Sequence, residues 1–193
     1  MYSIFCSLGL LFITMGSPFF SVAQSPSTVI PTPNLTPSLE ATVNGKPMQF
    51  NQGKIQATLV KEDGEITILA QTSTDILNTN ILLWSIIPVD TNFKVTKGEF
   101  KILPEEKSNN FIVKAEYSTN KEGNSKYWWT NTKHQGGGIL YVDEITQNSI
   151  KGRFSYTAIL EKEDGEMNPK ELVKVTNGRF SLPLEIKSRL ELP

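Results

Sequence analysis

Residues 54–71 read KIQATLVKEDGEITILAQ, two runs of alternating apolar and polar residues on either side of a turn. Apolar side chains share one face of each run, at Ile55, Ala57 and Leu59 and again at Ile66, Ile68 and Ala70. Asp63-Gly64 lies at the reversal, where a positive φ is needed and glycine supplies it at low cost. The stretch therefore predicts an antiparallel β-hairpin.

The same period of two continues along most of the chain. It predicts strands over 41–50, 80–87, 111–117, 149–160 and 172–186, and a short pair at 93–95 and 100–102 around Gly98. Asn44-Gly45 and Asn177-Gly178 are hairpin-turn dipeptides within two of these ranges. No window of a dozen residues has a helical period. About ten short strands predict an all-β fold, an antiparallel β-sandwich, with a closed up-and-down β-barrel as the alternative.

The N-terminal segment predicts export. Residues 1–23, MYSIFCSLGLLFITMGSPFFSVA, carry no charged side chain and end in Ser21-Val-Ala23, which suits signal peptidase. We interpret them as a cleaved signal peptide; an uncleaved membrane anchor is the alternative, because about 20 apolar residues can span a bilayer. The protein is then periplasmic, cell-surface or secreted. Cys6, the single cysteine, leaves with the peptide, so no disulfide or Cys-ligated metal is expected.

Composition divides the rest of the chain into three parts. Residues 24–38, QSPSTVIPTPNLTPS, form a Pro/Ser/Thr-rich linker that cannot build a core. Residues 39–187 form the β-rich globular domain, and 188–193 a C-terminal tail. The chain has 19 basic and 20 acidic residues with no basic block, which makes nucleic acid an unsuitable partner. After cleavage of the signal peptide we expect no transmembrane segment.

The residue inventory argues against an enzyme. His134 is the single histidine, and no G-x-S-x-G motif accompanies it. The sequence KEDGE occurs at 61–65 and 162–166 without the ligand spacing of a calcium loop, and solvated turns are the preferred interpretation. Asp143 and Glu144 are adjacent, so on a strand they point to opposite faces and make a poor glycosidase pair. We expect no catalytic residue, no metal and no cofactor.

Residues 125–138, SKYWWTNTKHQGGG, hold the strongest candidate for a binding site. Burying two large aromatic side chains of a strand rather than one gains about 4 kcal/mol, so Tyr127 and Trp129 are predicted to face the core. Trp128 then faces outward, as in a platform for sugar stacking. The predicted ligand-binding residues are Trp128, Lys126, Thr130 and His134. The three glycines at 136–138 are predicted to form a mobile lead-in to the next strand.

The last third of the chain carries a recognisable order of residues: Gly138, Leu140, Val142 and Ile145, then Ile150-Lys-Gly152-Arg-Phe154-Ser-Tyr156-Thr-Ala158, then Val175-Thr-Asn177-Gly178-Arg-Phe180 with Leu182-Pro183. Together with the Val43-Asn44-Gly45-Lys46 hairpin, it resembles the bacterial secreted family called domain of unknown function 6252. The resemblance covers roughly residues 38–185 and implies an exported β-rich domain with no assigned activity. Many relatives look like lipoproteins, whereas this chain lacks a lipobox cysteine.

Three functions remain open on these grounds. The chain is expected to be a non-catalytic module that binds an extracytoplasmic ligand, such as a glycan or an envelope protein. The alternatives are a structural or accessory component of a surface assembly that uses exposed strand edges, and a lipocalin-like barrel that carries a small apolar ligand.

We predict that signal peptidase cleaves after Ala23. The intact mass of the exported protein should correspond to a chain that begins at Gln24. A species that retains Cys6 would show that the segment stays attached as an anchor.

Overall fold

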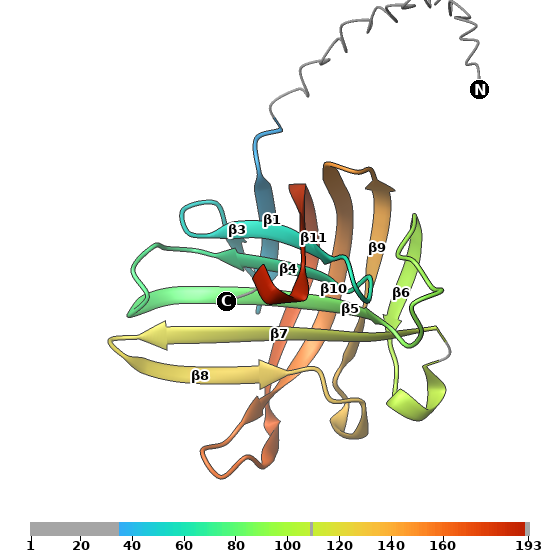
Figure 1. Ribbon diagram of the computed structural model, residues 1–193. Coiled ribbons are helices and arrows are strands. Elements are labelled where there is room, and N and C mark those ends of the chain that lie inside the picture. The colour runs from blue at the N-terminus through green and yellow to red at the C-terminus, as the bar shows by residue number, and fades with distance from the viewer. Residues whose placement is uncertain (1–34, 109, 192–193) are drawn as a thin grey trace, which may run out of the picture. The chain divides into compact units, whose positions relative to one another are not determined.

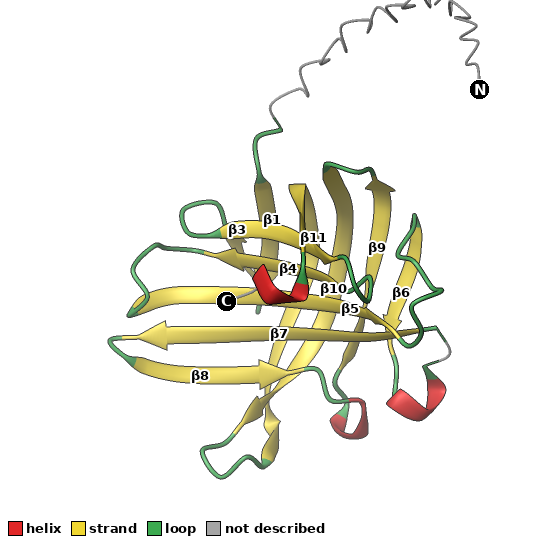
Figure 2. Cartoon of the chain, viewed as in Figure 1, coloured by secondary structure: helices red, strands yellow, loops and turns green. Residues whose placement is uncertain are grey.

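The computed structural model describes residues 35–108 and 110–191, so the predicted signal peptide and most of the predicted linker lie outside the described residues. The chain is nearly all β (Figures 1 and 2), which confirms the predicted fold class. The strands are β1 Ser38–Val43, β2 Lys46–Gln49, β3 Ile55–Val60, β4 Ile66–Gln71, β5 Asn78–Pro88, β6 Gly98–Ile102, β7 Phe111–Lys121, β8 Asn124–Trp129, β9 Gly137–Ile145, β10 Ser149–Glu161 and β11 Met167–Lys187. Three short 3-10 helices accompany them: η1 Glu105–Lys107, η2 Thr132–His134 and η3 Arg189–Glu191. None of the helices in the described ranges is long and apolar enough to cross a membrane.

The strands pair in the order β2-β1-β11-β3-β4-β5-β7-β8-β10-β9-β6, and β11 also pairs with β10. β3, β4, β5, β7 and β8 form one layer, and β1, β11, β10, β9 and β6 run across it in a second (Figure 1). This layering is consistent with the predicted sandwich. One pairing is parallel, that of Leu184–Lys187 in β11 with Ala57–Val60 in β3, and all the others are antiparallel. The pairings form a closed circuit: they run from β3 through β4, β5, β7 and β8 to β10, and β11 pairs with both β10 and β3.

β10 and β11 pair through two identical tripeptides, Gly152-Arg-Phe154 and Gly178-Arg-Phe180. Gly152 lies opposite Phe180, and Phe154 lies opposite Gly178. A Cβ atom on either glycine would collide with the ring of the facing phenylalanine. Each ring therefore occupies the space that the opposing glycine leaves free, and both rings are buried.

The hairpin predicted at Asn177-Gly178 does not form. β11 continues through these residues, and its register against both β1 and β10 shifts here, as in a β-bulge. Asn177 has a φ of 54°, a left-handed conformation that asparagine tolerates, so the extra residue is absorbed within the strand. Asn44-Gly45 does form the predicted turn between β1 and β2, with positive φ at both residues.

The pair predicted around Gly98 also does not form. Phe93 and Val95 lie outside the strands, and β6 instead pairs with β9 through Gly98–Ile102. Val95 is nevertheless buried, and the Phe93 ring lies 6.1 Å from that of Phe111. Their apolar side chains serve the core without the hydrogen-bond ladder of a strand.

Aromatic side chains fill the space between the two layers. Trp84 of β5 is 1% exposed, and its ring centroid lies 5.3 Å from that of Tyr156 and 5.8 Å from that of Phe154, both in edge-on geometry. Such contacts add about 0.5–1.5 kcal/mol each beyond burial. β10 supplies two of these three rings, so it joins the layers at their centre.

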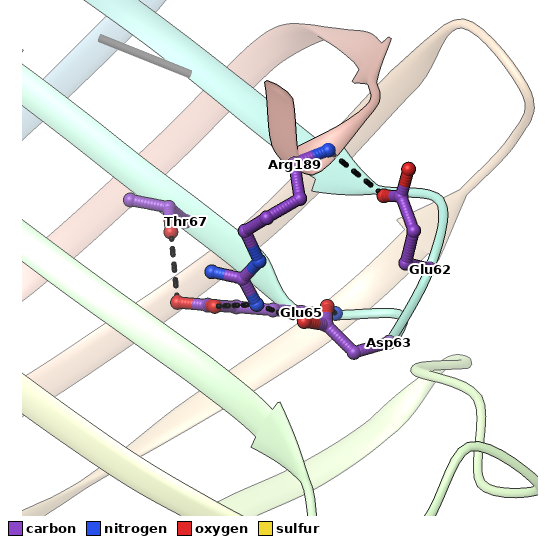
Figure 3. Close-up of polar contacts among 5 residues, drawn as sticks. All are labelled: Glu62, Asp63, Glu65, Thr67 and Arg189. Carbon is purple, nitrogen blue, oxygen red and sulfur yellow. Dashed lines mark hydrogen bonds and ion pairs between the residues drawn. The ribbon is translucent and has the colours of Figure 1, made fainter. Parts of the chain in front are cut away.

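The C-terminal residues fasten the parallel pairing (Figure 3). The Arg189 backbone N–H donates to Glu62 Oε2 at 2.9 Å, and its guanidinium group contacts Asp63 and donates to Glu65 Oε2 at 3.3 Å. The first KEDGE turn is thus an anchor for η3. In the second, Lys162 forms an ion pair with Glu166 at 3.0 Å. In both turns the aspartate accepts the N–H of the following glutamate, so the repeat reflects shared turn chemistry.

We predict that Gly178→Ala lowers the free energy of unfolding by about 1–3 kcal/mol, because its methyl group would displace the Phe154 ring. Gly137→Ala is the matched control, since a Cβ there meets nothing within 4 Å. It should change stability by less than about 0.5 kcal/mol in urea titrations. Equal losses from both variants would contradict the proposed Gly–Phe packing.

Candidate functional site

The prediction for Tyr127, Trp128 and Trp129 was wrong about which faces they occupy. Trp128 points inward: it packs against the core, with its ring 5.8 Å from that of Tyr117. Tyr127 and Trp129 point outward and are 44% and 37% exposed. The strand pairings give the reason, because Trp128 lies between two buried neighbours, Tyr117 of β7 and Leu160 of β10.

The other predicted site residues, Lys126, Thr130 and His134, have different surroundings and do not form a common site. The Thr130 hydroxyl donates to the carbonyl oxygen of Ala115 and accepts from its N–H, both at 3.0 Å, so it holds the end of β8 against β7. Lys126 is exposed near the β7–β8 turn. His134 is exposed at the end of η2. No hydrogen bond or ion pair between described residues joins Lys126, Thr130 and His134 to one another.

Two of the three glycines at 136–138 are closely packed. Gly137 and Gly138 begin β9, and Gly138 pairs with Tyr156. Cβ atoms on Gly136 and Gly138 would collide with the backbone of Asn131 and of Ser155. Close approach of two backbone segments therefore accounts for two of these glycines.

The outward rings of Tyr127 and Trp129 form a surface with two carboxylates, which we call the aromatic face: Tyr127, Trp129, Glu116 and Glu161. Trp129 lies opposite Glu116 on β7, and Tyr127 lies opposite Glu161 on β10. The Trp129 Nε1–H donates to Glu161 Oε2 at 2.7 Å, which fixes the indole ring. Ile159, fully buried, lies opposite Trp129 on β10. The two rings start about 6–7 Å apart along β8.

A hollow of about 750 Å³ adjoins this surface, between the β7–β8 turn and the β10–β11 turn. Tyr127 and Glu161 line it together with Lys126 and polar residues of the two turns. The hollow is open to solvent on the outer side of the sheet. A ligand that rests on Tyr127 can therefore extend into it.

Burial raises the pKa of the Glu116 carboxyl group, and the charge of Glu161 raises it further. A hydrogen bond with Ser118 opposes both effects. The raised pKa means that the folded state disfavours the ionised form of Glu116. The Tyr156 hydroxyl donates to the Glu116 carbonyl oxygen at 2.8 Å, so the backbone beneath this carboxyl group is tied to the core.

The aromatic face has the chemistry of a binding surface. Ring faces contact apolar C–H groups, and ionised carboxylates accept hydrogen bonds from hydroxyl groups. Within the described part of the chain, no group of three or more His, Cys, Asp or Glu side chains is arranged to hold a metal ion. The predicted site did not include Glu116 or Glu161, although the alternation of residues 111–117 places Glu116 on the face opposite to Ala115 and Tyr117.

Comparison with known proteins finds no matching family model, curated protein or solved structure. The resemblance to the secreted family therefore stays a prediction.

We predict that Glu116→Gln stabilises the protein at pH 7. The folded pKa of this carboxyl lies above its ordinary value of 4.5, so ionisation at neutral pH opposes folding. The advantage of the variant should shrink as the pH falls through the raised pKa and disappear below about 4.5. Urea titrations at pH 7 and pH 4 measure it.

Glu163→Gln, which removes an exposed carboxylate from the β10–β11 turn, is the control and should alter stability little at either pH. A Glu116→Gln variant that is less stable than the parent at pH 7 would contradict the assigned cause.

Proposed function

We propose that the chain is a non-catalytic, extracytoplasmic module that binds a neutral glycan on its aromatic face. The observation that carries the proposal is the pair of outward rings on β8, with Trp129 fixed by Glu161 and an open hollow beside Tyr127. The export assignment rests on the predicted signal peptide and on the family resemblance.

The charges of the aromatic face favour a neutral ligand that is rich in hydroxyl groups. Glu116 and Glu161 offer acceptors to hydroxyl donors and repel anions. The rings of Tyr127 and Trp129 present flat apolar surface to the C–H side of a sugar. Because β8 is paired on both sides, by β7 and β10, the spacing of the rings is held before the ligand arrives.

The edge-pairing alternative has less support. The outermost strands of the sheet are β2 and β6. β2 is four residues long and contains Pro47, while β6 carries Glu99 and Lys101. Short length, proline and charge are the features by which natural sheets block edge-to-edge pairing.

The lipocalin-like alternative also has less support. It needs an open apolar interior, whereas Trp84, Phe154 and Tyr156 meet between the layers. The filled interior therefore favours a ligand bound on the outer surface over a ligand enclosed between the layers.

Trp129→Ala tests the proposal. On an array of neutral oligosaccharides the wild-type protein should bind at least one, and Trp129→Ala should weaken that binding about tenfold or more through lost stacking. The inward Trp128→Ala should instead lower stability by about 3–5 kcal/mol.

Tyr141→Ala is the matched control for binding, because it removes an outward ring from β9 and leaves β8 intact. Absence of any neutral glycan ligand, equal binding by Trp129→Ala and the parent, or cleavage of the bound oligosaccharide would each refute the proposed function.

A further inference from the structure

The register that pairs glycine with phenylalanine inside also places two arginines together outside. Arg153 of β10 lies directly opposite Arg179 of β11, and both side chains are exposed. Like charges in directly opposed positions of an antiparallel pair are destabilising. The pair therefore calls for an explanation other than stability.

The two guanidinium groups have different surroundings. Arg153 lies over the Tyr141 ring, 4.2 Å from its centroid, and its Nε is 3.4 Å from Asp143 Oδ1. Arg179 forms no side-chain hydrogen bond or ion pair with any described residue. Its cross-strand neighbour Glu40 lies beyond ion-pair distance. One arginine is thus held in place, and the other keeps its donors free.

Both arginines border one hollow of about 630 Å³ on the outer side of β1, β11, β10 and β9. Ser155, Thr176 and Asn177 add polar side chains to its lining, and Glu40 is its one carboxylate. The lining carries two positive charges against one negative charge. The bulge at Asn177 lies in this hollow, so the irregularity of β11 shapes it.

We propose that Arg153 and Arg179 form a binding site for an oxyanion, the carboxylate or phosphate group of a small ligand. Each guanidinium group is a planar fork of N–H donors that matches the oxygen atoms of such groups. A bound oxyanion removes the repulsion between the two arginines and supplies acceptors to Arg179. This site is separate from the aromatic face and does not depend on the function proposed for it.

Trigalacturonate and tripolyphosphate are suitable probes, because they separate a carboxylate source from a phosphate source. We expect the full chain to bind one of them in calorimetric titrations, with affinity that falls as salt rises. The Arg153→Gln/Arg179→Gln double variant should bind that probe about tenfold or more weakly. Trp129→Ala should bind it as the parent does.

The Lys170→Gln/Lys174→Gln double variant is the matched control. It removes the same charge from exposed positions of β11 and should retain affinity. Without a probe, Arg179→Gln should unfold at the same temperature as the parent or higher, because one of two opposed charges is gone. Failure of both probes to bind the parent, equal loss in the two double variants, or a marked drop in the unfolding temperature of Arg179→Gln would each overturn the proposal.

Discussion

Phe180 lies over Gly152 and Phe154 over Gly178, and this exchange fixes the register of β10 against β11. If either strand slipped by one residue, its phenylalanine would turn outward and its arginine would enter the core. β11 also pairs with β1 and β3, and β10 with β8 and β9. In the second layer, β1 and β9 therefore each pair directly with β11 or β10. β6 is attached through β9, and β2 is attached through β1. The parallel pairing of β11 with β3 connects the second layer to the first. Arg189, which follows β11, donates to Glu65 between β3 and β4 and stabilises this connection.

The sequence predicted the all-β fold because a period of two is a local property of each strand. The sequence-based prediction was wrong where the strands on both sides of a segment determine its conformation. Asn44 and Asn177 each precede glycine and each have a positive φ, 47° and 54°. Asn44 has a strand on one side only, where it exchanges hydrogen bonds with Lys174 of β11, and it turns the chain. Asn177 lies between β1 and β10 and becomes a bulge. The dipeptide specifies the backbone conformation, and the neighbouring strands determine whether it ends a strand or bends one.

The reversed faces of β8 have a similar origin. Counting buried area favours placing two rings inside rather than one, and that reasoning treats the outer surface as fully solvated. On β8 it is not, because Trp129 is opposite Glu116 and Ile159 and remains only 37% exposed. The inner position of Trp128 is set by Tyr117 and Leu160, whose place in the core no local pattern near residue 128 reveals. The sequence prediction thus reversed the inward and outward side chains of this strand.

Alternation along β10 allows one strand to serve the core and both proposed sites. Phe154 and Tyr156 point inward to Trp84, while Arg153 and Glu161 point outward at positions about 26 Å apart for an extended strand. Outward side chains can change with little effect on packing, because the rings that fill the interior alternate with them. The inward rings fill the interior, so both proposed sites lie on the outer surface. The rigidity that holds Trp129 and Arg153 in place comes from the same hydrogen-bond ladder that stabilises the fold, and neither site needs a mobile loop to bring its residues together.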